Sequence, residues 1–338
     1  MVGNLLVLTA DDVRTIVDGR EEDMIEAVRE AYQMHARGCS SLPHSTFLRF
    51  PSDLRNRIVS LPAFLGGGEP IAGIKWIASF PDNRNIGLER ASAILILNDP
   101  CTGMPDTVME GSIVSAKRTA ASAALAASCF IRHLNLDSIG VVGCGRINLE
   151  ILRFLGLVVP RAKRLILFDI DREQADKMAA KSREFFPDAH QCVAARIEDL
   201  LAETDLVSFA TTASTPYFGE KRSLRPGSNI LHISLRDLAP EVILACDNVV
   251  DDVYHVCREQ TSVHLAENLV GNRDFIRCTL ADILSGNAAP KKDCESVTIF
   301  SPFGLGILDL AVGRLVRNAA RKDGLGLLIA SFLPERLM

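Results

Sequence analysis

The chain has 338 residues, which is more than one ordinary hydrophobic core holds and predicts two domains. Hydrophobic residues make up 48% of it and charged residues 23%, a composition typical of a folded globular protein. The net charge of -5, with no basic block to offset it, argues against nucleic-acid binding, and no apolar run is long enough to span a bilayer. The first residues lack the pattern of a secretory signal, so we expect a cytoplasmic protein.

The cysteines and histidines give no sign of a disulfide framework or a metal site. The nine cysteines are an odd number, and no two of them stand at C-x-x-C spacing. The seven histidines are equally scattered, without an H-x-x-x-H pair. We therefore expect free thiols in a reducing compartment and no bound metal.

The first third of the chain predicts helices followed by a strand-rich segment. Helical spacing of apolar residues begins after Thr9 and returns in an amphipathic helix over Glu21–His35. Turns rich in Pro and Gly then separate four strand patterns, which are Ser45–Phe50, Arg57–Ala63, Gly73–Phe80 and Ala91–Asn98. Strands joined by short turns favour an antiparallel or mixed sheet. A helix rich in small residues, Ile113–Ser128, follows.

From Leu136 onward, strand and helix patterns alternate, which predicts a parallel sheet with helices on both faces. The expected strands are Ser138–Val142, Arg164–Phe168, Gln191–Ala194, Leu206–Ala210, Asn229–Ile233 and Asn248–Val250. The expected helices are Ile147–Leu157, Arg172–Phe185 and, after the last strand, Ile307–Arg321. We predict an α/β protein with a Rossmann domain over residues 131–304 and a mixed or antiparallel α+β domain from residues 1–130 and 305–338.

A dinucleotide-binding loop is predicted between the first strand and first helix of the Rossmann domain. Gly143-Cys144-Gly145 supplies a tight turn whose backbone can approach a pyrophosphate at the start of a helix that opens with Arg146 and Ile147. Asp169 ends the second strand, where a carboxylate accepts hydrogen bonds from ribose hydroxyls and repels a 2′-phosphate. We therefore expect NAD rather than NADP as the cofactor.

The third position of the glycine motif departs from the pattern, because it holds Asn148. A glycine there normally allows close packing of the helix on the strand. We expect Asn148 either to push the helix outward or to place its amide in the interface.

Several segments together resemble the ornithine cyclodeaminase and mu-crystallin superfamily, which includes an alanine dehydrogenase branch. They are Met109–Ala121, Gly73–Trp76, Leu97–Pro100 and Phe303-Gly304. The segments Ser41–His44, Leu48-Arg49, Gly73–Ile77 and Leu88–Ser92 are similar to one branch in particular, the enzymes of 2,3-diaminopropionate biosynthesis. This resemblance implies oxidation of N-(2-amino-2-carboxyethyl)-L-glutamate by NAD. Hydrolysis of the imine then gives 2,3-diaminopropionate and 2-oxoglutarate, for a siderophore or an antibiotic.

A substrate with three carboxylates needs several cations, and the first domain offers Arg49, Lys75, Arg90 and Arg118, to which the resemblance adds Ser92. Strand alternation alone favours a solvated Lys75, but the matching lysine contacts the substrate in relatives, so we expect a catalytic and substrate-binding role. Arg118 is by pattern a solvated helix charge. The resemblance implies that it binds a substrate carboxylate beside the cofactor.

Asp237 follows the strand pattern at Ile230–Ser234, at the sheet edge where α/β proteins place ligands. A carboxylate there can take a proton from water or from the amine, and the position matches the family's catalytic aspartate. We expect a general base, with an ordinary loop aspartate as the alternative. Arg236 either keeps Asp237 ionised or contacts the substrate.

Further cofactor contacts are expected near the ends of the Rossmann strands. Thr211 and Thr212 either lie beside the ribose or nicotinamide or cap the following turn. Gly304 either lets the chain pass close to the nicotinamide or forms a turn. Thr119 and Ser234 complete the expected set.

Two positions depart from the family. Ser45 stands where many relatives have arginine or lysine, so we expect Arg49 to supply that charge. Pro302 stands where relatives have serine, which removes one cofactor contact.

Three functions remain open after these observations. The first is the NAD-dependent oxidation already described, which the cations Arg49 and Arg90 favour. The second is a cyclodeaminase that converts ornithine or lysine to proline or pipecolate and recycles its NAD. The third is a non-catalytic ligand-binding protein like mu-crystallin, against which the retention of Lys75 and Asp237 argues. The resemblance also implies a homodimer built by the first domain.

Overall fold

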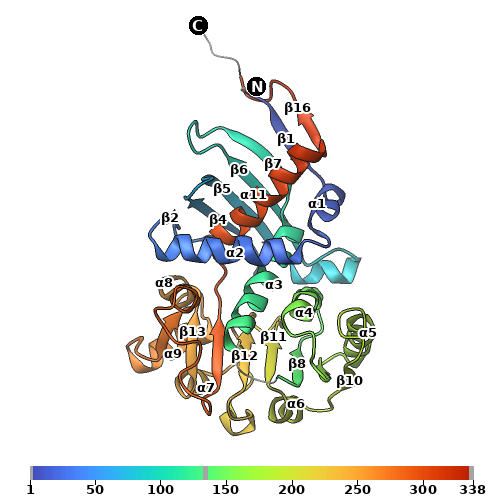
Figure 1. Ribbon diagram of the computed structural model, residues 1–338, viewed down its shortest axis with the longest axis vertical. Helices are drawn as coiled ribbons and strands as arrows, with labels where there is room; N and C mark the ends of the chain where they lie inside the picture. Colours follow the sequence, from blue (N-terminus) through green and yellow to red (C-terminus); the bar gives the residue numbers. More distant parts are fainter. Residues whose placement is uncertain (1–2, 132–135, 335–338) are drawn as a thin grey trace. The chain divides into compact units, whose positions relative to one another are not determined.

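The computed structural model describes residues 3–131 and 136–334, and the chain divides into two compact units (Figure 1). The terminal unit combines Met1–Arg118 with Leu305–Met338, and the central unit is Thr119–Gly304. The division falls inside helix α3 (Gly111–Phe130), whereas the expected domain boundary lies at the end of that helix. None of the helices in the described ranges is long and apolar enough to cross a membrane.

The terminal unit is built on a mixed sheet, as predicted. Its strand order is β16-β1-β7-β6-β5-β4-β2, with β3 paired to β4. The pair β1–β7 is parallel and the others are antiparallel. The strands are β1 (Leu5–Leu8), β2 (Ser40–Ser41), β3 (Thr46–Phe50), β4 (Asp53–Leu65), β5 (Ile71–Ser79), β6 (Ala91–Asn98), β7 (Pro105–Glu110) and β16 (Leu327–Ile329).

Sequence patterns missed β1, β7 and β16, which lie together at one edge of this sheet. Each has only three to six residues, too few for alternation to stand out from the neighbouring turns and helices. In β7 the alternation is present, because Thr107 and Met109 are buried between half-buried neighbours. The adjacent Pro- and Gly-containing turn masked it.

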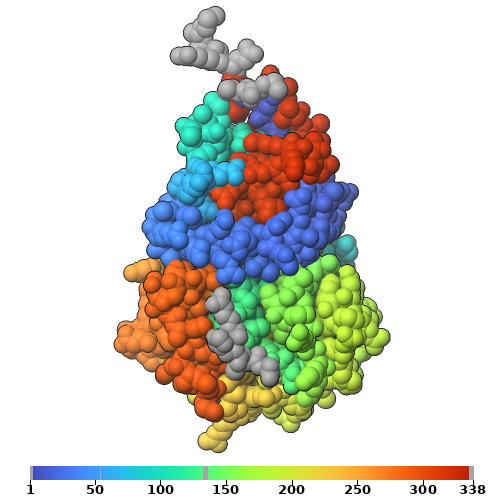
Figure 2. Space-filling model, in the orientation of Figure 1, coloured from blue at the N-terminus to red at the C-terminus, as the bar shows by residue number. Residues whose placement is uncertain are grey.

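Two helices cover one face of the terminal sheet, and both lie at the surface in the space-filling view (Figure 2). They are α2 (Glu21–Ala36) and α11 (Gly306–Asp323), and α1 (Ala10–Val17) packs beside them. Helix α11 can approach the strands closely because it carries Gly313, where a Cβ would come within 2.5 Å of the Leu95 side chain. This close packing brings the first turn of α11 against β5.

The central unit contains an eight-stranded parallel sheet, which confirms the predicted Rossmann architecture. Its order is β10-β9-β8-β11-β12-β15-β13-β14. The strands are β8 (Ser138–Val142), β9 (Arg164–Phe168), β10 (His190–Val193), β11 (Leu206–Phe209), β12 (Asn229–His232), β13 (Asp247–Val250), β14 (Ile276–Thr279) and β15 (Thr298–Ser301). The helices are α4 (Arg146–Val158), α5 (Arg172–Ser182), α6 (Ile197–Glu203), α7 (Pro240–Leu244), α8 (Val253–Val256), α9 (Ser262–Val270) and α10 (Leu280–Leu284).

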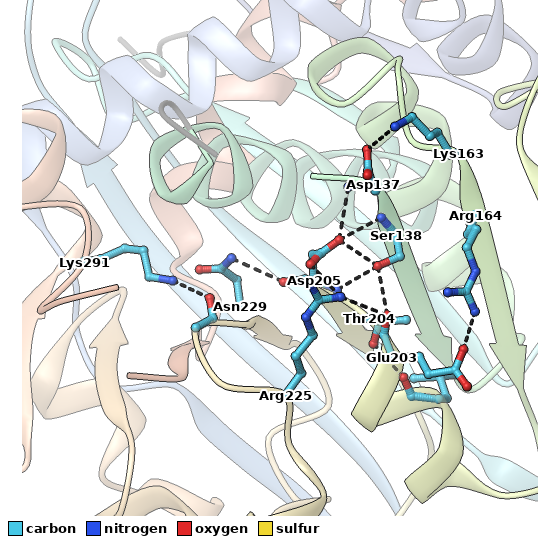
Figure 3. Close-up of polar contacts among 12 residues, drawn as sticks. Asp137, Ser138, Lys163, Arg164, Glu203, Thr204, Asp205, Arg225, Asn229 and Lys291 are labelled. Carbon is cyan, nitrogen blue, oxygen red and sulfur yellow. Dashed lines mark hydrogen bonds and ion pairs between the residues drawn. The ribbon is translucent and has the colours of Figure 1, made fainter. Parts of the chain in front are cut away.

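The strand order of this sheet reverses between β8 and β11, because β9 and β10 follow on one side and β11 and β12 on the other. Ligands of such sheets bind at the carboxyl ends of the strands at this point. The opposite ends are tied by polar contacts around Asp205 (Figure 3). One oxygen of its carboxylate accepts bonds from the Asp137 and Ser138 backbone N–H groups at 3.1 and 3.0 Å. This network holds the amino ends of β8 and β11 together, and the carboxyl ends are left for a ligand.

Candidate active site

The loop between β8 and α4 has the backbone geometry of a phosphate-binding turn. Gly143 has a φ of 87°, and a Cβ there would lie 2.7 Å from the Ala210 carbonyl oxygen, so a larger residue does not fit. Gly145 is the N-cap of α4, no side chain caps the helix there, and a Cβ would meet no atom within 4 Å. The start of α4 therefore borders open space where backbone N–H groups can meet an anion.

Asp169 lies directly beside this loop, at the end of β9. Its two carboxylate oxygens accept hydrogen bonds from the backbone N–H groups of Cys144 at 2.7 Å and Asp171 at 2.9 Å. The residue is half-buried, and each carboxylate oxygen keeps a second lone pair for a ribose hydroxyl. Burial, together with the Asp169 charge, raises the pKa of the Cys144 thiol to about 12, so this thiol stays protonated at neutral pH.

Asn148 places its amide in the helix–strand interface, the second of the two outcomes expected for it. The side chain is fully buried, and its Nδ2 donates to the carbonyl oxygens of Val142 at 3.0 Å and Gly143 at 2.7 Å. Its Oδ1 accepts from the Ser208 hydroxyl at 2.6 Å. The asparagine thus holds the phosphate loop to β8 and β11 by hydrogen bonds in place of glycine packing.

We expect Asn148→Ala to weaken NAD binding and to lower the free energy of unfolding by about 1–3 kcal/mol, because buried carbonyl groups and a hydroxyl lose their partner. Calorimetric NAD titration and thermal unfolding measure the two effects. Asn287→Ala, in an exposed loop of the same unit, is the control. Unchanged NAD affinity in Asn148→Ala would contradict a loop held in place by this amide.

Asp237 lies in the turn after β12 and is fully buried among four hydrogen-bonding side chains. The Oδ1 atom accepts from the Thr211 hydroxyl at 2.5 Å and the Tyr217 phenol at 3.1 Å. The Oδ2 atom contacts the Ser234 hydroxyl and lies 3.3 Å from Nε2 of His232.

Burial by itself raises the pKa of Asp237, but the hydrogen bond and charge of His232 and the hydroxyls of Ser234 and Thr211 outweigh it, and the net shift is downward. Asp237 is therefore ionised at neutral pH. Tyr217, 49% exposed, is the most exposed of the side chains that contact Asp237.

The backbone before Asp237 is held in an unusual conformation. Leu235 has a φ of 66°, rare for a residue with a branched side chain, and its carbonyl oxygen accepts from the Ser262 N–H at 2.7 Å. Arg236 donates to the Glu259 carbonyl oxygen at 2.6 Å. These contacts fix the turn, as is common where strained backbone positions a reactive side chain.

The terminal unit holds a second buried cluster, which joins Lys75 of β5 to Arg118 of α3. Asp309 of α11 pairs with both, at 2.8 Å from Lys75 Nζ and 3.1 Å from Arg118 Nε. Lys75 also donates to the Ser115 hydroxyl at 3.0 Å. All three charged side chains are buried, with Lys75 2% exposed. The lysine therefore faces the covered side of the sheet, against what alternation alone favours.

The pKa of Lys75 falls to about 8, chiefly because burial disfavours its charge and next because Arg118 lies nearby, while Asp309 acts in the opposite direction. Two cations share one carboxylate, and in the described parts of the chain no other carboxylate pairs with either. The cluster thus keeps an excess positive charge in a buried place, which favours an anionic ligand.

The structure places Ser92 apart from this cluster and gives Arg49 and Arg90 contacts of their own. Ser92 pairs with Ala78 in the β5–β6 ladder, whereas Lys75 pairs with Leu95, so Ser92 is on the opposite face of the sheet. Arg49 stacks over the Phe47 ring at 5.5 Å, and Arg90 donates to the Ser79 hydroxyl at 3.1 Å.

At the two family departures, the structure has a buried hydroxyl in one case and a hydrogen-bonded turn in the other. Ser45, where the resemblance led us to expect a cation, is buried, and its hydroxyl has no partner among the described residues. Pro302 precedes a turn in which the N–H groups of Phe303 and Gly304 donate to Asp251 at 2.9 and 2.7 Å. Gly304 has a φ of 93°, which accounts for the glycine as a turn residue.

The remaining expected cofactor residues lie on helices α3 and α4 and in the turn after β11. Thr119 is half-buried on α3, Thr212 is exposed after β11, and Arg146 and Ile147 form the first turn of α4. Thr211 caps the following turn, because its hydroxyl accepts from the Ala213 N–H at 3.1 Å, and the same hydroxyl donates to Asp237.

Sequence reasoning missed Asp309, Tyr217, His232 and Asp251. The sequence did indicate Asp309, since it is a charged residue inside the apolar run Ile307–Ala311 of an otherwise amphipathic helix. A charge at such a position is seldom buried without a partner. No sequence pattern indicated Tyr217 or His232, because each is recognised only by its contact with Asp237, which lies outside its own segment.

The chain is similar to known proteins over nearly its whole length. Residues 5–324 match the ornithine cyclodeaminase/mu-crystallin family. The N-((2S)-2-amino-2-carboxyethyl)-L-glutamate dehydrogenase of Staphylococcus aureus is 26% identical over 95% of this chain and 97% of its own length.

Two solved structures share the fold over nearly the whole chain. An archaeal alanine dehydrogenase dimer with bound NAD is 25% identical, with a TM-score of 0.85 over 96% of this chain and 99% of that one. The Δ(1)-pyrroline-2-carboxylate reductase of Thermococcus litoralis, in complex with NADH and L-proline, is 23% identical, with a TM-score of 0.86 over 95% and 99%. The chain belongs to the ornithine cyclodeaminase/mu-crystallin family.

Proposed function

We propose that the protein is an NAD-dependent oxidoreductase that oxidises the secondary amine of N-(2-amino-2-carboxyethyl)-L-glutamate, here called the N-substituted glutamate. The observation that carries this proposal is the buried pair Lys75 and Arg118 on the single carboxylate of Asp309, an arrangement suited to a substrate carboxylate. The similarity to the S. aureus dehydrogenase supports the choice of substrate. The products are 2,3-diaminopropionate, 2-oxoglutarate and NADH.

The loop Gly143-Cys144-Gly145 with the first turn of α4 fits the pyrophosphate of NAD, because its backbone faces open space at an uncapped helix start. Asp169 would hold the ribose hydroxyls and exclude a 2′-phosphate. Ile170 next to it is 99% exposed and offers apolar surface to an adenine. Bound NAD would accept the hydride from the carbon beside the amine nitrogen.

The residues of the two clusters divide the remaining work. Lys75 and Arg118 bind and orient a substrate carboxylate. Ionised Asp237 takes up the proton that the amine nitrogen loses, through the phenol of Tyr217, which donates to it at 3.1 Å and reaches solvent. Water then adds to the imine carbon, and the carbon–nitrogen bond breaks. The amine leaves as 2,3-diaminopropionate and the carbonyl product is 2-oxoglutarate.

This role of Lys75 predicts a pH dependence. Its pKa of about 8 means that the lysine loses its charge as the pH rises through that value, and with it part of the attraction for a carboxylate. We expect kcat/KM, which reports the free enzyme, to fall above about pH 8. In Lys75→Arg, whose side chain stays charged, the fall moves to higher pH. A fall at the same pH in both proteins would show that another group is responsible.

We also propose that a second copy of the chain covers the outer face of the terminal sheet. Leu48, Trp76 and Ile94 share this face and are 49%, 41% and 46% exposed. The related archaeal alanine dehydrogenase is a dimer. We expect the wild type to sediment as a dimer and Trp76→Lys as a monomer. A monomeric wild type would contradict this proposal.

The function is tested by incubating the purified protein with NAD and one candidate substrate, namely the N-substituted glutamate, ornithine, lysine or alanine. Nicotinamide absorbance and the organic products are measured together. We expect NADH only with the N-substituted glutamate, and one 2-oxoglutarate for each NADH. Proline or pipecolate formed without net NADH would establish a cyclodeaminase instead. Binding without turnover of any of them would establish a mu-crystallin-like protein.

A further inference from the structure

A second group of cations lies on the same face of the terminal sheet as Lys75. Lys75 and Ser79 are four residues apart on β5, so their side chains point to the same face. Their Cα atoms are about 13 Å apart along the strand. Arg57 of β4 is paired with Ser79, and Arg49 of β3 is paired with Arg57. Directly paired residues share a face, so the arginines line the side of the sheet that carries Lys75.

Arg90 joins this group from the turn before β6. Its guanidinium donates to the Ser79 hydroxyl at 3.1 Å and is half-buried. No carboxylate within residues 3–131 and 136–334 forms an ion pair with Arg90. Burial lowers its pKa, and so do the nearby charges of Arg57 and Arg84. A partly buried guanidinium among like charges and without a carboxylate partner is costly unless an anion binds beside it.

Between the two cationic groups the sheet offers an apolar floor. The paired residues Val59, Ile77 and Ala93 occupy the row between Lys75 and Ser79 and are half-buried. Helix α11 begins at Gly306, against Leu61 and Ala63, which lie on the other side of this floor from Arg57. A chain of carbon atoms with an anionic group at each end therefore matches this floor, which has Lys75 on one side and Arg57 with Arg90 on the other.

We propose that Arg57 and Arg90, with Ser79, form a second anion subsite that binds the distal carboxylate of the substrate. It selects amino-acid derivatives with carboxylates at both ends of the molecule over monocarboxylates such as alanine, proline and ornithine. The inference rests on the proposed function, because it assumes that Lys75 and Arg118 bind the first carboxylate. Arginine suits the position because its planar group can bind a carboxylate through two hydrogen bonds.

The test compares two ligands that differ only at the distal carboxylate. They are the N-substituted glutamate and its counterpart in which norvaline replaces glutamate, so that a methyl group stands in place of the carboxylate. Binding to the protein–NADH complex is measured by calorimetry, where no turnover occurs. We expect the wild type to bind the first ligand about 10- to 100-fold more tightly. Arg57→Gln and Arg90→Gln should lose most of this preference and keep their affinity for the norvaline ligand.

Arg55→Gln is the matched control, since Arg55 is on the same strand but is exposed and paired with Asp53 and Asp82. It should keep the full preference. Equal binding of the two ligands to the wild type, an intact preference in Arg57→Gln and Arg90→Gln, or an equal loss of both ligands would each overturn the subsite.

The two proposals fail in different ways. If the protein binds the distal carboxylate through Arg57 and Arg90 but does not oxidise the N-substituted glutamate, the proposed function fails and the subsite stands. If it oxidises the compound and both variants retain the preference, the subsite fails and the function stands.

Discussion

Asp237→Asn is expected to lower kcat by about 10²- to 10⁴-fold while leaving NAD affinity nearly unchanged, the range over which a positioned acid or base contributes to catalysis. The asparagine keeps the shape of the side chain but cannot take up the proton that the amine releases. Asp237 hydrogen-bonds Thr211, and an asparagine oxygen can still accept from that hydroxyl, so we expect the backbone around Gly143 to stay in place. Stopped-flow measurement of NADH formation checks the fall in kcat, and calorimetric titration with NAD checks the affinity.

Asp188→Asn, an exposed carboxylate in the same unit, is the control for Asp237→Asn and should behave as wild type. Tyr217→Phe tests the path of the proton, since it removes the phenol that bonds Asp237 and keeps the ring. We expect an intermediate loss of kcat there. Turnover that survives in Asp237→Asn would show that another group accepts the proton.

Asp309→Asn is expected to lower the free energy of unfolding by about 3–5 kcal/mol, because it leaves the buried charges of Lys75 and Arg118 without their carboxylate. The pKa of Lys75 should fall below about 8 at the same time, since Asp309 is the group that raises it. Substrate affinity should therefore drop at neutral pH even in the fraction that remains folded. Chemical denaturation measures the first effect and calorimetric titration the second.

Asp323→Asn, at the exposed end of the same helix, controls for a general effect on α11 and should cost little. Asp309→Glu keeps the charge and should recover part of the stability. If Asp309→Asn unfolds at the same denaturant concentration as wild type, the cluster does not depend on this carboxylate.

The sequence predicted the fold well where elements repeat a clear pattern. Alternation of strand and helix predicted the parallel sheet, and the glycines of the phosphate loop marked the point at which the chain order reverses. The short strands at the edge of the terminal sheet were missed, because a few residues cannot display a period.

The candidate site was predictable where family segments carried it and not where contacts join distant residues. Lys75 and Arg118 were expected, but their shared partner Asp309 lies 234 and 191 residues away along the chain, and only packing of α11 on the sheet brings it there. From the sequence, Arg57 was predicted only as the first residue of a strand. In the structure it pairs with Ser79, whose hydroxyl accepts a hydrogen bond from Arg90, so the two arginines are neighbours. Asn148 was visible as a departure, and its hydrogen bonds explain how a loop without the third glycine stays closed.

A crystal structure of the protein with NADH and the N-substituted glutamate tests the central claim most directly, because neither compound can be consumed in that combination. We predict one substrate carboxylate on Lys75 and Arg118 and the adenosine ribose hydroxyls on Asp169. A substrate whose carboxylates make no contact with Lys75 and Arg118, or a dinucleotide bound away from Gly143 and Asp169, would contradict the account.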